Sequence, residues 1–189
     1  MIVMHSGREF TGRKSVVALG MFDGVHIGHQ KLIRTAVELA ESMDAECIVC
    51  TFDRHPLSLL KPEIAPEPLM TLEENLRKFE QLGADRALIQ PFTKEFAAML
   101  PEDYIEQLVD SLHAKAIVIG ENYSFGREGR GNAQMVRQLA TKYGYRAKIV
   151  EPVADKEGMI SSTRIRKLMK SGEEERAKAL LDIRNTQGE

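Results

Sequence analysis

Short apolar stretches alternate along the chain with longer segments whose apolar residues recur at helical spacing. Such apolar stretches are typical of strands. We predict strands at Ser15–Leu19, Glu46–Phe52, Arg86–Gln90 and Ala116–Ile119, and a weaker one at Arg146–Val150. Helices are predicted near 28–43, 72–82, 101–112, 133–143, 161–171 and 173–181. This alternation favours βαβ units, so we expect a Rossmann-like α/β fold, a parallel sheet of about five strands with helices on both faces.

The length of 189 residues fits one domain, and we expect residues 1–189 to form it, with a core at about 15–181. The proline-rich piece 61–68 is too short to link two domains, so we predict a rigid surface loop there. In a parallel sheet the ligand crevice lies beyond the carboxyl ends of the strands. The loops after the predicted strands are therefore where binding residues are expected.

Composition excludes several classes of function. The 26 Lys and Arg nearly balance the 28 Asp and Glu, and a net charge of -2 gives no basic excess for a nucleic-acid partner. No apolar run approaches the roughly 18 residues that cross a bilayer. His5, Arg8 and Glu9 stand where a signal peptide would be apolar, so we expect a cytoplasmic protein without a membrane partner. Cys47 and Cys50 should point to opposite faces of a strand, as core thiols rather than a metal or redox pair.

The most informative loop is 20–30, GMFDGVHIGHQ, which joins the first predicted strand to the first predicted helix. Its histidines, His26 and His29, lie three apart at a helix N-terminus, where backbone N–H groups favour phosphate. Gly24 and Gly28 allow the backbone to approach a ligand closely. Taken alone, two histidines could also stand in a loop by chance or bind a metal.

A second helix start carries hydroxyl and basic side chains. Residues 160–166 read ISSTRIR, with hydroxyls beside N-terminal amides and with Arg164 and Arg166 placed to meet phosphate oxygens. Taken alone, this piece is equally well explained as a capped amphipathic helix with solvated basic residues.

Together the two motifs resemble the HxGH nucleotidyltransferases, α/β enzymes that move a nucleoside monophosphate from ATP or CTP to a phosphate-bearing acceptor. GMFDGVHIGH matches their first signature, and ISSTRIR matches the second, S-S-T-x-x-R. The loops 51–56 (TFDRHP) and 120–126 (GENYSFG) resemble those of bacterial FAD synthetases, specifically the FMN adenylyltransferase domain. The likeness runs over about 15–181, although Arg54 replaces a usual proline and Ser124 a common arginine.

The resemblance implies transfer of AMP from ATP to the phosphate of FMN, giving FAD and pyrophosphate, with Mg²⁺ expected. Bifunctional members continue into a riboflavin kinase domain, whereas here seven residues follow Asp182. We therefore expect no riboflavin kinase activity and a separate riboflavin kinase that supplies FMN. The alternatives are another HxGH adenylyl- or cytidylyltransferase, or a catalytically idle sensor of flavin or nucleotide. The glycines of loop 126–131 also suggest a segment that closes over the substrate.

The resemblance also implies roles for individual residues. The ATP-binding set is Gly20, Phe22, Asp23, Gly24, His26, Gly28, His29, Ser161, Ser162, Thr163 and Arg164. The FMN-binding set is Phe52, Asp53, His55, Pro56, Asn122, Tyr123, Phe125 and Arg127. The catalytic candidates are His26, His29, Asn122, Asp53 and Arg164, with Asn122 and Asp53 also the candidates for holding the metal. Aromatic residues at the ends of several strands independently favour a flat acceptor.

Overall fold

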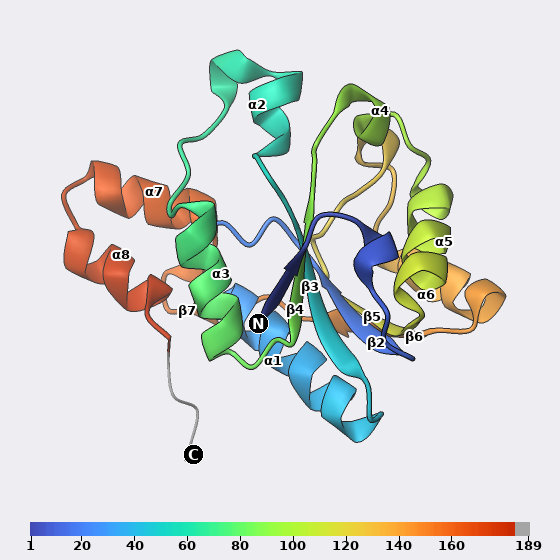
Figure 1. The fold of residues 1–189 in the computed structure, drawn as a ribbon. Coiled ribbons are helices and arrows are strands. Elements are labelled where there is room, and N and C mark those ends of the chain that lie inside the picture. The colour runs from blue at the N-terminus through green and yellow to red at the C-terminus, as the bar shows by residue number, and fades with distance from the viewer. Residues whose placement is uncertain (184–189) are drawn as a thin grey trace.

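The computed structural model, shown in Figure 1, describes residues 1–183. Six parallel strands form one sheet in the order β1-β4-β3-β2-β5-β6. They are β1 (Ile2–Met4), β2 (Ser15–Leu19), β3 (Glu46–Phe52), β4 (Arg86–Gln90), β5 (Ala114–Gly120) and β6 (Arg146–Val150). The predicted Rossmann-like α/β fold is confirmed, and four of the predicted strands have the predicted bounds.

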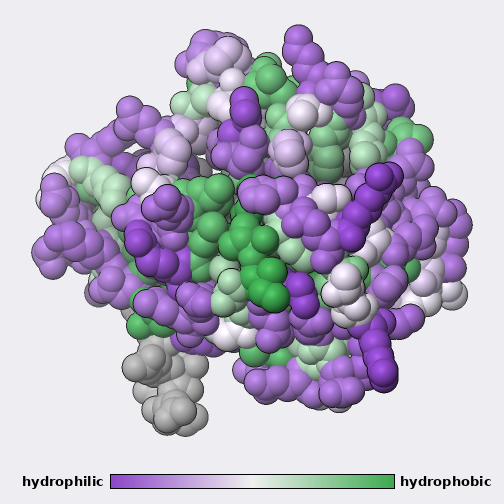
Figure 2. All heavy atoms as spheres, in the orientation of Figure 1, coloured by the Kyte–Doolittle hydropathy of each residue, from purple (hydrophilic) through white to green (hydrophobic). Residues whose placement is uncertain are grey.

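The sixth strand, β1, is a correction to the expected number. It is three residues long and lies at the sheet edge beside β4, where Ile2 and Val3 are exposed. A strand of three apolar residues, of which only Met4 is buried, is too short to show periodicity in the sequence. Figure 2 shows a limited patch of apolar surface on this face, surrounded by polar side chains.

Helices cover both faces of the sheet, as expected. All the predicted helices are present, as α1 (Ile27–Ser42), α3 (Leu72–Gln81), α5 (Pro101–Leu112), α6 (Ala133–Tyr143), α7 (Ser162–Lys170) and α8 (Glu174–Leu181). Shorter elements were not predicted; they are α2 (Pro56–Leu60), α4 (Lys94–Ala97), three 3-10 turns (Gly7–Glu9, Pro62–Ile64, Arg127–Gly129) and the antiparallel hairpin β7 (Ala154–Asp155) and β8 (Gly158–Met159). One of the 3-10 turns lies inside the proline-rich loop 61–68.

The strands divide the core into two layers because successive side chains alternate across the sheet. On one side, strand residues such as Ile117 pack with α5 and α6, and Cys50 lies in this layer. On the other side, strand residues pack with α1 and α3, and Cys47 lies there. The predicted separation of the two cysteines is therefore confirmed, and both are free and buried.

A smaller third cluster joins α7 and α8 to the rest of the molecule. Ile165 of α7 and Leu181 of α8 are buried in it, and Ile27 at the start of α1 and Leu69 before α3 pack against it. Figure 1 shows α7 and α8 side by side next to α3. This packing holds the start of α7 next to the start of α1.

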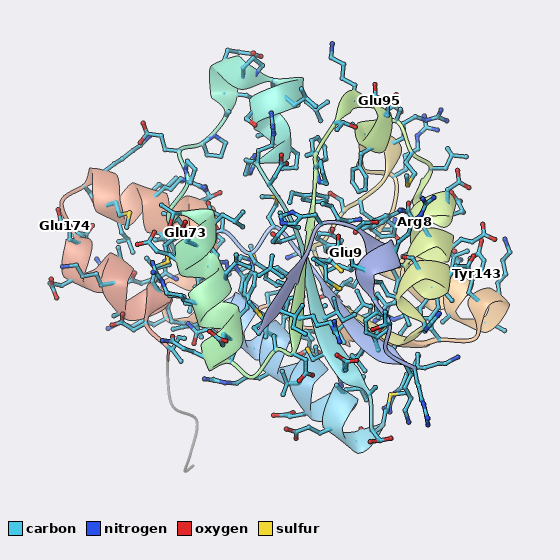
Figure 3. All side chains as sticks on the ribbon, viewed as in Figure 1. Arg8, Glu9, Glu73, Glu95, Tyr143 and Glu174 are labelled. Atoms are coloured by element: carbon cyan, nitrogen blue, oxygen red, sulfur yellow. The ribbon has the colours of Figure 1, made fainter. Side chains whose placement is uncertain are left out.

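Charged side chains of these helices project outward. Figure 3 shows Glu73 on α3, Glu95 on α4 and Glu174 on α8 pointing to solvent. Within residues 1–183, no helix combines the length and the apolar character needed to cross a bilayer.

Substitution of a central core residue tests this packing. Ile117, on β5, has no exposed surface, so Ile117→Ala should lower the free energy of unfolding by about 2–5 kcal/mol through lost burial and a cavity. Ile2 is 53% exposed, so the matched change Ile2→Ala should cost less than about 0.5 kcal/mol. Urea unfolding measures both, and equal losses would contradict the assigned core.

Candidate active site

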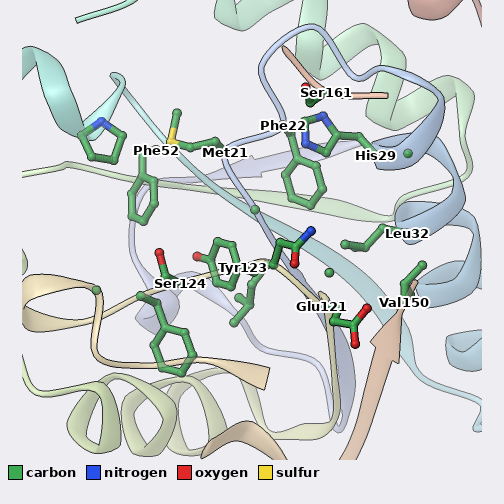
Figure 4. Close-up of a pocket in the computed structure, with 18 of the residues that line it drawn as sticks. Met21, Phe22, His29, Leu32, Phe52, Glu121, Tyr123, Ser124, Val150 and Ser161 are labelled. Carbon is green, nitrogen blue, oxygen red and sulfur yellow. The ribbon is translucent and has the colours of Figure 1, made fainter. Parts of the chain in front are cut away.

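A cavity of about 580 Å³ opens at the carboxyl edge of the sheet. It is lined by residues at the ends of four neighbouring strands, with Gly20 after β2, Phe52 at the end of β3, Glu121 after β5 and Val150 at the end of β6. Figure 4 shows Phe22 and His29 beside Ser161, with Phe52 and Tyr123 on other walls. This is the crevice that the strand order predicts.

Many predicted site residues come together here. Those that line the cavity are Gly20, Phe22, His26, Gly28, His29, Phe52, His55, Pro56, Asn122, Tyr123, Phe125 and Ser161. The predicted residues outside its lining are Asp23, Gly24, Asp53, Arg127, Ser162, Thr163 and Arg164. Asp23 and Asp53 instead line a smaller adjoining hollow of about 90 Å³, which shares Phe52 and His55 with the main cavity.

The loop from β2 to α1, residues 20–26, has an unusual backbone. We call it the phosphate loop because phosphate binding is predicted there. Phe22 and Val25 have positive φ angles of 49° and 46°, and Gly24 has φ of 79°. Positive φ is uncommon for any residue with a side chain, and for a β-branched residue such as valine it is a strained conformation. A Cβ at Gly24 would also come within 2.8 Å of Leu181 Cδ2, so any other residue there would be strained.

The two histidines stack at the N-terminus of α1. His26 is the N-cap residue, and the His29 backbone N–H donates to its Nδ1 over 3.4 Å. Their ring centroids lie 3.7 Å apart. Because a neutral ring whose Nδ1 accepts a hydrogen bond carries its proton on Nε2, His26 has an Nε2–H donor to offer. His29 Nδ1 is buried and makes no hydrogen bond to any residue of 1–183.

Both imidazoles are neutral at pH 7. Burial lowers the pKa of His26 from 6.5 to about 4, and the hydrogen bond at its own backbone only partly offsets this. Burial, and then repulsion from His26 when that ring is protonated, lower the pKa of His29 well below 6.5. The pair therefore offers hydrogen bonds rather than positive charge.

The second motif lies against the first. Ser161 caps α7 and lines the cavity, while the Ser162 hydroxyl donates to the backbone oxygen of Asp23 over 3.1 Å. A side chain at Gly28 would lie 3.9 Å from the Ile160 oxygen, which shows how closely the two helix starts approach. The N-termini of two helices thus meet at one edge of the cavity, where their dipoles favour an anion. Thr163 is exposed outside this edge.

The two arginines of the motif have different partners. Arg164 binds both carboxylate oxygens of Asp155 at 2.8 Å and a Glu157 oxygen at 2.9 Å, on the β7–β8 hairpin. Arg166 forms an ion pair with Asp23 of the phosphate loop and lines the adjoining hollow. Arg166, rather than Arg164, therefore lies at the junction of the motifs. The spacing S-S-T-x-x-R places its arginine at 166, so the sequence already contained the signal for Arg166.

Asp53 and Asn122 lie in different hollows. Asp53 accepts hydrogen bonds from the Phe92 backbone N–H at 2.9 Å and from Arg54. Burial opposes ionisation of Asp53, but these bonds together lower its pKa. Asn122 lines the main cavity, and its amide donates to Met159 Sδ over 3.5 Å. Residues 1–183 hold no cluster of three or more His, Cys, Asp or Glu suited to a metal ion, so the metal role of this pair stays a prediction.

Aromatic side chains form the wall opposite the histidines. Phe52 meets Phe92 and Phe96 edge to face, with ring centroids 5.2 and 5.3 Å apart. Tyr123 stacks on Phe125 at 5.9 Å. His55 caps α2 at the rim, where its Nδ1 accepts the Leu57 N–H, and Arg127 lies outside the lining.

The sequence analysis missed several lining residues. They include Met21, Leu32, Leu60, Phe92, Phe96, Tyr104, Glu121, Ser124, Val150 and Met159. Some belong to elements far from either motif in the sequence, such as Phe96 of α4 and Tyr104 of α5. Others follow strand ends directly, so their position was the available signal.

The fold and the site define an α/β protein whose two signature motifs meet over one nucleotide-sized crevice. Residues 9–164 match the sequence model of the family described as FAD synthetase. The chain belongs to the FAD synthetase family.

The curated relatives carry corresponding names. A bifunctional riboflavin kinase/FMN adenylyltransferase of Bacillus subtilis is 37% identical over 170 residues, covering 89% of this chain and 53% of the relative. An FAD synthetase of Listeria monocytogenes is 31% identical, covering 89% of this chain and 69% of the relative. The chain thus spans about half the length of several bifunctional relatives that it matches.

A solved structure shows the same fold. A protein of Streptococcus pneumoniae, named a macrolide-efflux protein, superposes with a TM-score of 0.81 at 31% identity, covering 95% of this chain and 60% of that one.

The lowered histidine pKa values predict a pH-dependent stability. Because the folded-state pKa of His26 lies below its unfolded value, unfolding takes up a proton between pH 6.5 and about 4, and stability falls as the pH falls through that range. The full loss from His26 alone is on the order of 3 kcal/mol. His26→Asn keeps an N-cap acceptor without titrating, so its stability should depend less on pH there.

Urea unfolding at intervals from pH 7 to pH 4 measures the difference. His5→Asn, which changes an exposed histidine, should follow the wild-type profile. Parallel profiles for wild type and His26→Asn would contradict a buried neutral His26.

Proposed function

We propose that this chain is an FMN adenylyltransferase, which transfers AMP from ATP to the phosphate of FMN and releases FAD and pyrophosphate. The observation that carries the proposal is one cavity bounded on one side by two helix N-termini and on the other by an aromatic wall. The first side suits phosphates and the second suits a flat ring system. The names of the relatives support the same activity.

The reaction needs charge neutralisation more than proton transfer. A phosphate monoester has a second pKa near 6, so the FMN phosphate is mostly dianionic at pH 7 and attacks without a general base. Its oxygen forms a bond to the α-phosphorus of ATP while the bond from that phosphorus to pyrophosphate breaks. Charge then builds on the α-phosphoryl oxygens and on the leaving group, where fixed donors lower the barrier.

The neutral histidines suit this role. Their N–H groups can donate to the α- and β-phosphates. Because the rings carry no charge, they form no ion pair that would retain the pyrophosphate product. The position of His26 is fixed by its N-cap bond, and that of His29 by the Phe22 ring at 5.3 Å. Donors held in place before the reaction need no reorganisation at the transition state.

The roles proposed for the remaining residues follow from where each lies relative to the cavity. Ser161 and the first amides of α7 would hold the β- and γ-phosphates, with Arg166 near them, and Ser162 would support the phosphate loop through Asp23. Arg164 lies outside the cavity lining, and its contacts favour a structural role on the hairpin. The flavin would lie against the aromatic wall, where Phe52, Tyr123 and Phe125 line the cavity.

Mg²⁺ would arrive with the nucleotide rather than occupy a resident protein site. The ion commonly takes most of its ligands from phosphate and water, which matches the lack of a metal-binding cluster within residues 1–183. Asn122 is the predicted metal ligand that faces the cavity. We also propose a cytoplasmic location, where the thiols of Cys47 and Cys50 would stay reduced. The separate source of FMN stays a prediction.

The direct test incubates the purified chain with Mg-ATP and either FMN or riboflavin, and follows FAD and pyrophosphate by chromatography. FAD formed from FMN supports the proposal. Binding of FMN without FAD formation would favour the sensor alternative. Failure to bind FMN would favour another HxGH transferase with a different acceptor.

Loss of one fixed donor should slow the reaction strongly. His29→Ala should lower kcat by about 10²- to 10³-fold at saturating ATP, the usual cost of removing a transition-state donor. His5→Ala, at an exposed histidine, should leave kcat unchanged. A loss below tenfold for His29→Ala, in a variant that still unfolds cooperatively, would exclude His29 from this role.

A further inference from the structure

The strained phosphate loop is held from behind by side chains that do not line the cavity. Gly24 donates its backbone N–H to Asn75 Oδ1 over 3.1 Å, and its carbonyl accepts a hydrogen bond from Lys78 Nζ at 3.3 Å. Asn75 and Lys78 both belong to α3. The next carbonyl, that of Val25, accepts from Gln30 Nε2 at 3.0 Å. Both backbone polar groups of Gly24 are thus fixed by one helix.

The same side chains reach the end of α8. Lys78 Nζ also donates to the Leu181 carbonyl, and Gln30 Nε2 to the carbonyls of Leu181 and Asp182 at 3.3 and 2.9 Å. The last carbonyls of a helix have no partner within the helix and require donors from elsewhere. Lys78 and Gln30 therefore join two sets of backbone carbonyls, those of the phosphate loop and those at the end of α8.

The position of Lys78 makes the hydrogen bonds of its ammonium difficult for another group to replace. Its ammonium is half-buried, and burial lowers its pKa, opposed by the nearby charges of Asp182 and Glu74. Gly24 has φ of 79° and Val25 has φ of 46°, a backbone that persists only where the surroundings determine it. Without the ammonium, water or a relaxed loop would have to satisfy the Gly24 carbonyl.

We infer that Lys78 is a positioning residue for adenylyl transfer. Its ammonium ties the Gly24 carbonyl of the phosphate loop to the last turn of α8. This link keeps His26 and the first amides of α1 aligned with the α-phosphate. Asn75 and Gln30 complete this clamp. The inference rests on the proposed adenylyl transfer. It assigns a role in the reaction to α3 and to the end of α8. The residues concerned there, Lys78, Leu181 and Asp182, do not line the cavity.

Lys78→Met tests the clamp because it keeps an unbranched side chain, one heavy atom shorter, and removes the donor. Misplacing the phosphate donors by about 1 Å costs up to about 10²-fold in rate, so kcat should fall about 10- to 100-fold while KM for ATP changes less than threefold. Gln30→Met, which loosens the loop from the other side, should change kcat in the same direction. Lys78→Arg, which keeps N–H donors, should retain more activity than Lys78→Met.

The matched control is Arg77→Met. Arg77 is the adjacent residue on α3 and is exposed, so this variant makes the same charge change without touching the loop. Its kcat should equal that of wild type. Unfolding midpoints of all variants separate loss of the clamp from loss of the fold.

Hydrogen exchange of the backbone amides gives a readout that needs no turnover. Amides of residues 22–26 and of the last turn of α8 should exchange faster in Lys78→Met than in wild type, and at the wild-type rate in Arg77→Met. Unchanged exchange in folded Lys78→Met, or a kcat within twofold of wild type, would overturn the inference. If the wild-type chain formed no FAD at all, the proposed function would fail, and the exchange measurement would still decide whether Lys78 holds the loop.

Discussion

The strained turn between β2 and α1 is the constraint on which the rest of the site depends. It places His26 as the cap of α1 and brings Gly28 and His29 of the first turn of that helix to the cavity lining. The strain at Phe22 and Val25 is balanced by burial of both side chains and by the hydrogen bonds that Gly24 and Val25 make to α3 and α1. A loop with fewer supports would relax and lose the alignment of its donors.

The sheet explains why this loop meets the other parts of the site. Because β2 lies between β3 and β5, its carboxyl end is flanked by Phe52 at the end of β3 and by Tyr123 in the loop after β5. The chain returns after β6 through the hairpin, and α7 then packs in the third cluster against Ile27 at the start of α1. Burial of Ile165 and Leu168 therefore brings the second motif to the first, although more than a hundred residues separate them.

The sequence allowed most of the fold to be predicted because the strands β2, β3 and β4 are apolar on both faces and the long helices are amphipathic. It did not reveal β1 or the hairpin, since two or three residues contain no measurable period. The motifs located His26, His29 and Ser161, but the side-chain direction of Arg164 depends on Asp155 and Glu157, which only the folded hairpin provides. The Lys78 clamp was equally hidden, because its partners are backbone carbonyls, which any residue type supplies.

The central claim is that neutral, fixed donors support direct attack of the FMN phosphate on ATP, with no covalent adenylyl group on a histidine. The stereochemical course at phosphorus tests this most directly, using one diastereomer of ATP with a sulfur on the α-phosphate. A single in-line displacement predicts inversion of configuration in the thio-substituted FAD product. Retention would show two successive displacements through an adenylylated side chain, and it would contradict the role of His26 and His29 as hydrogen-bond donors.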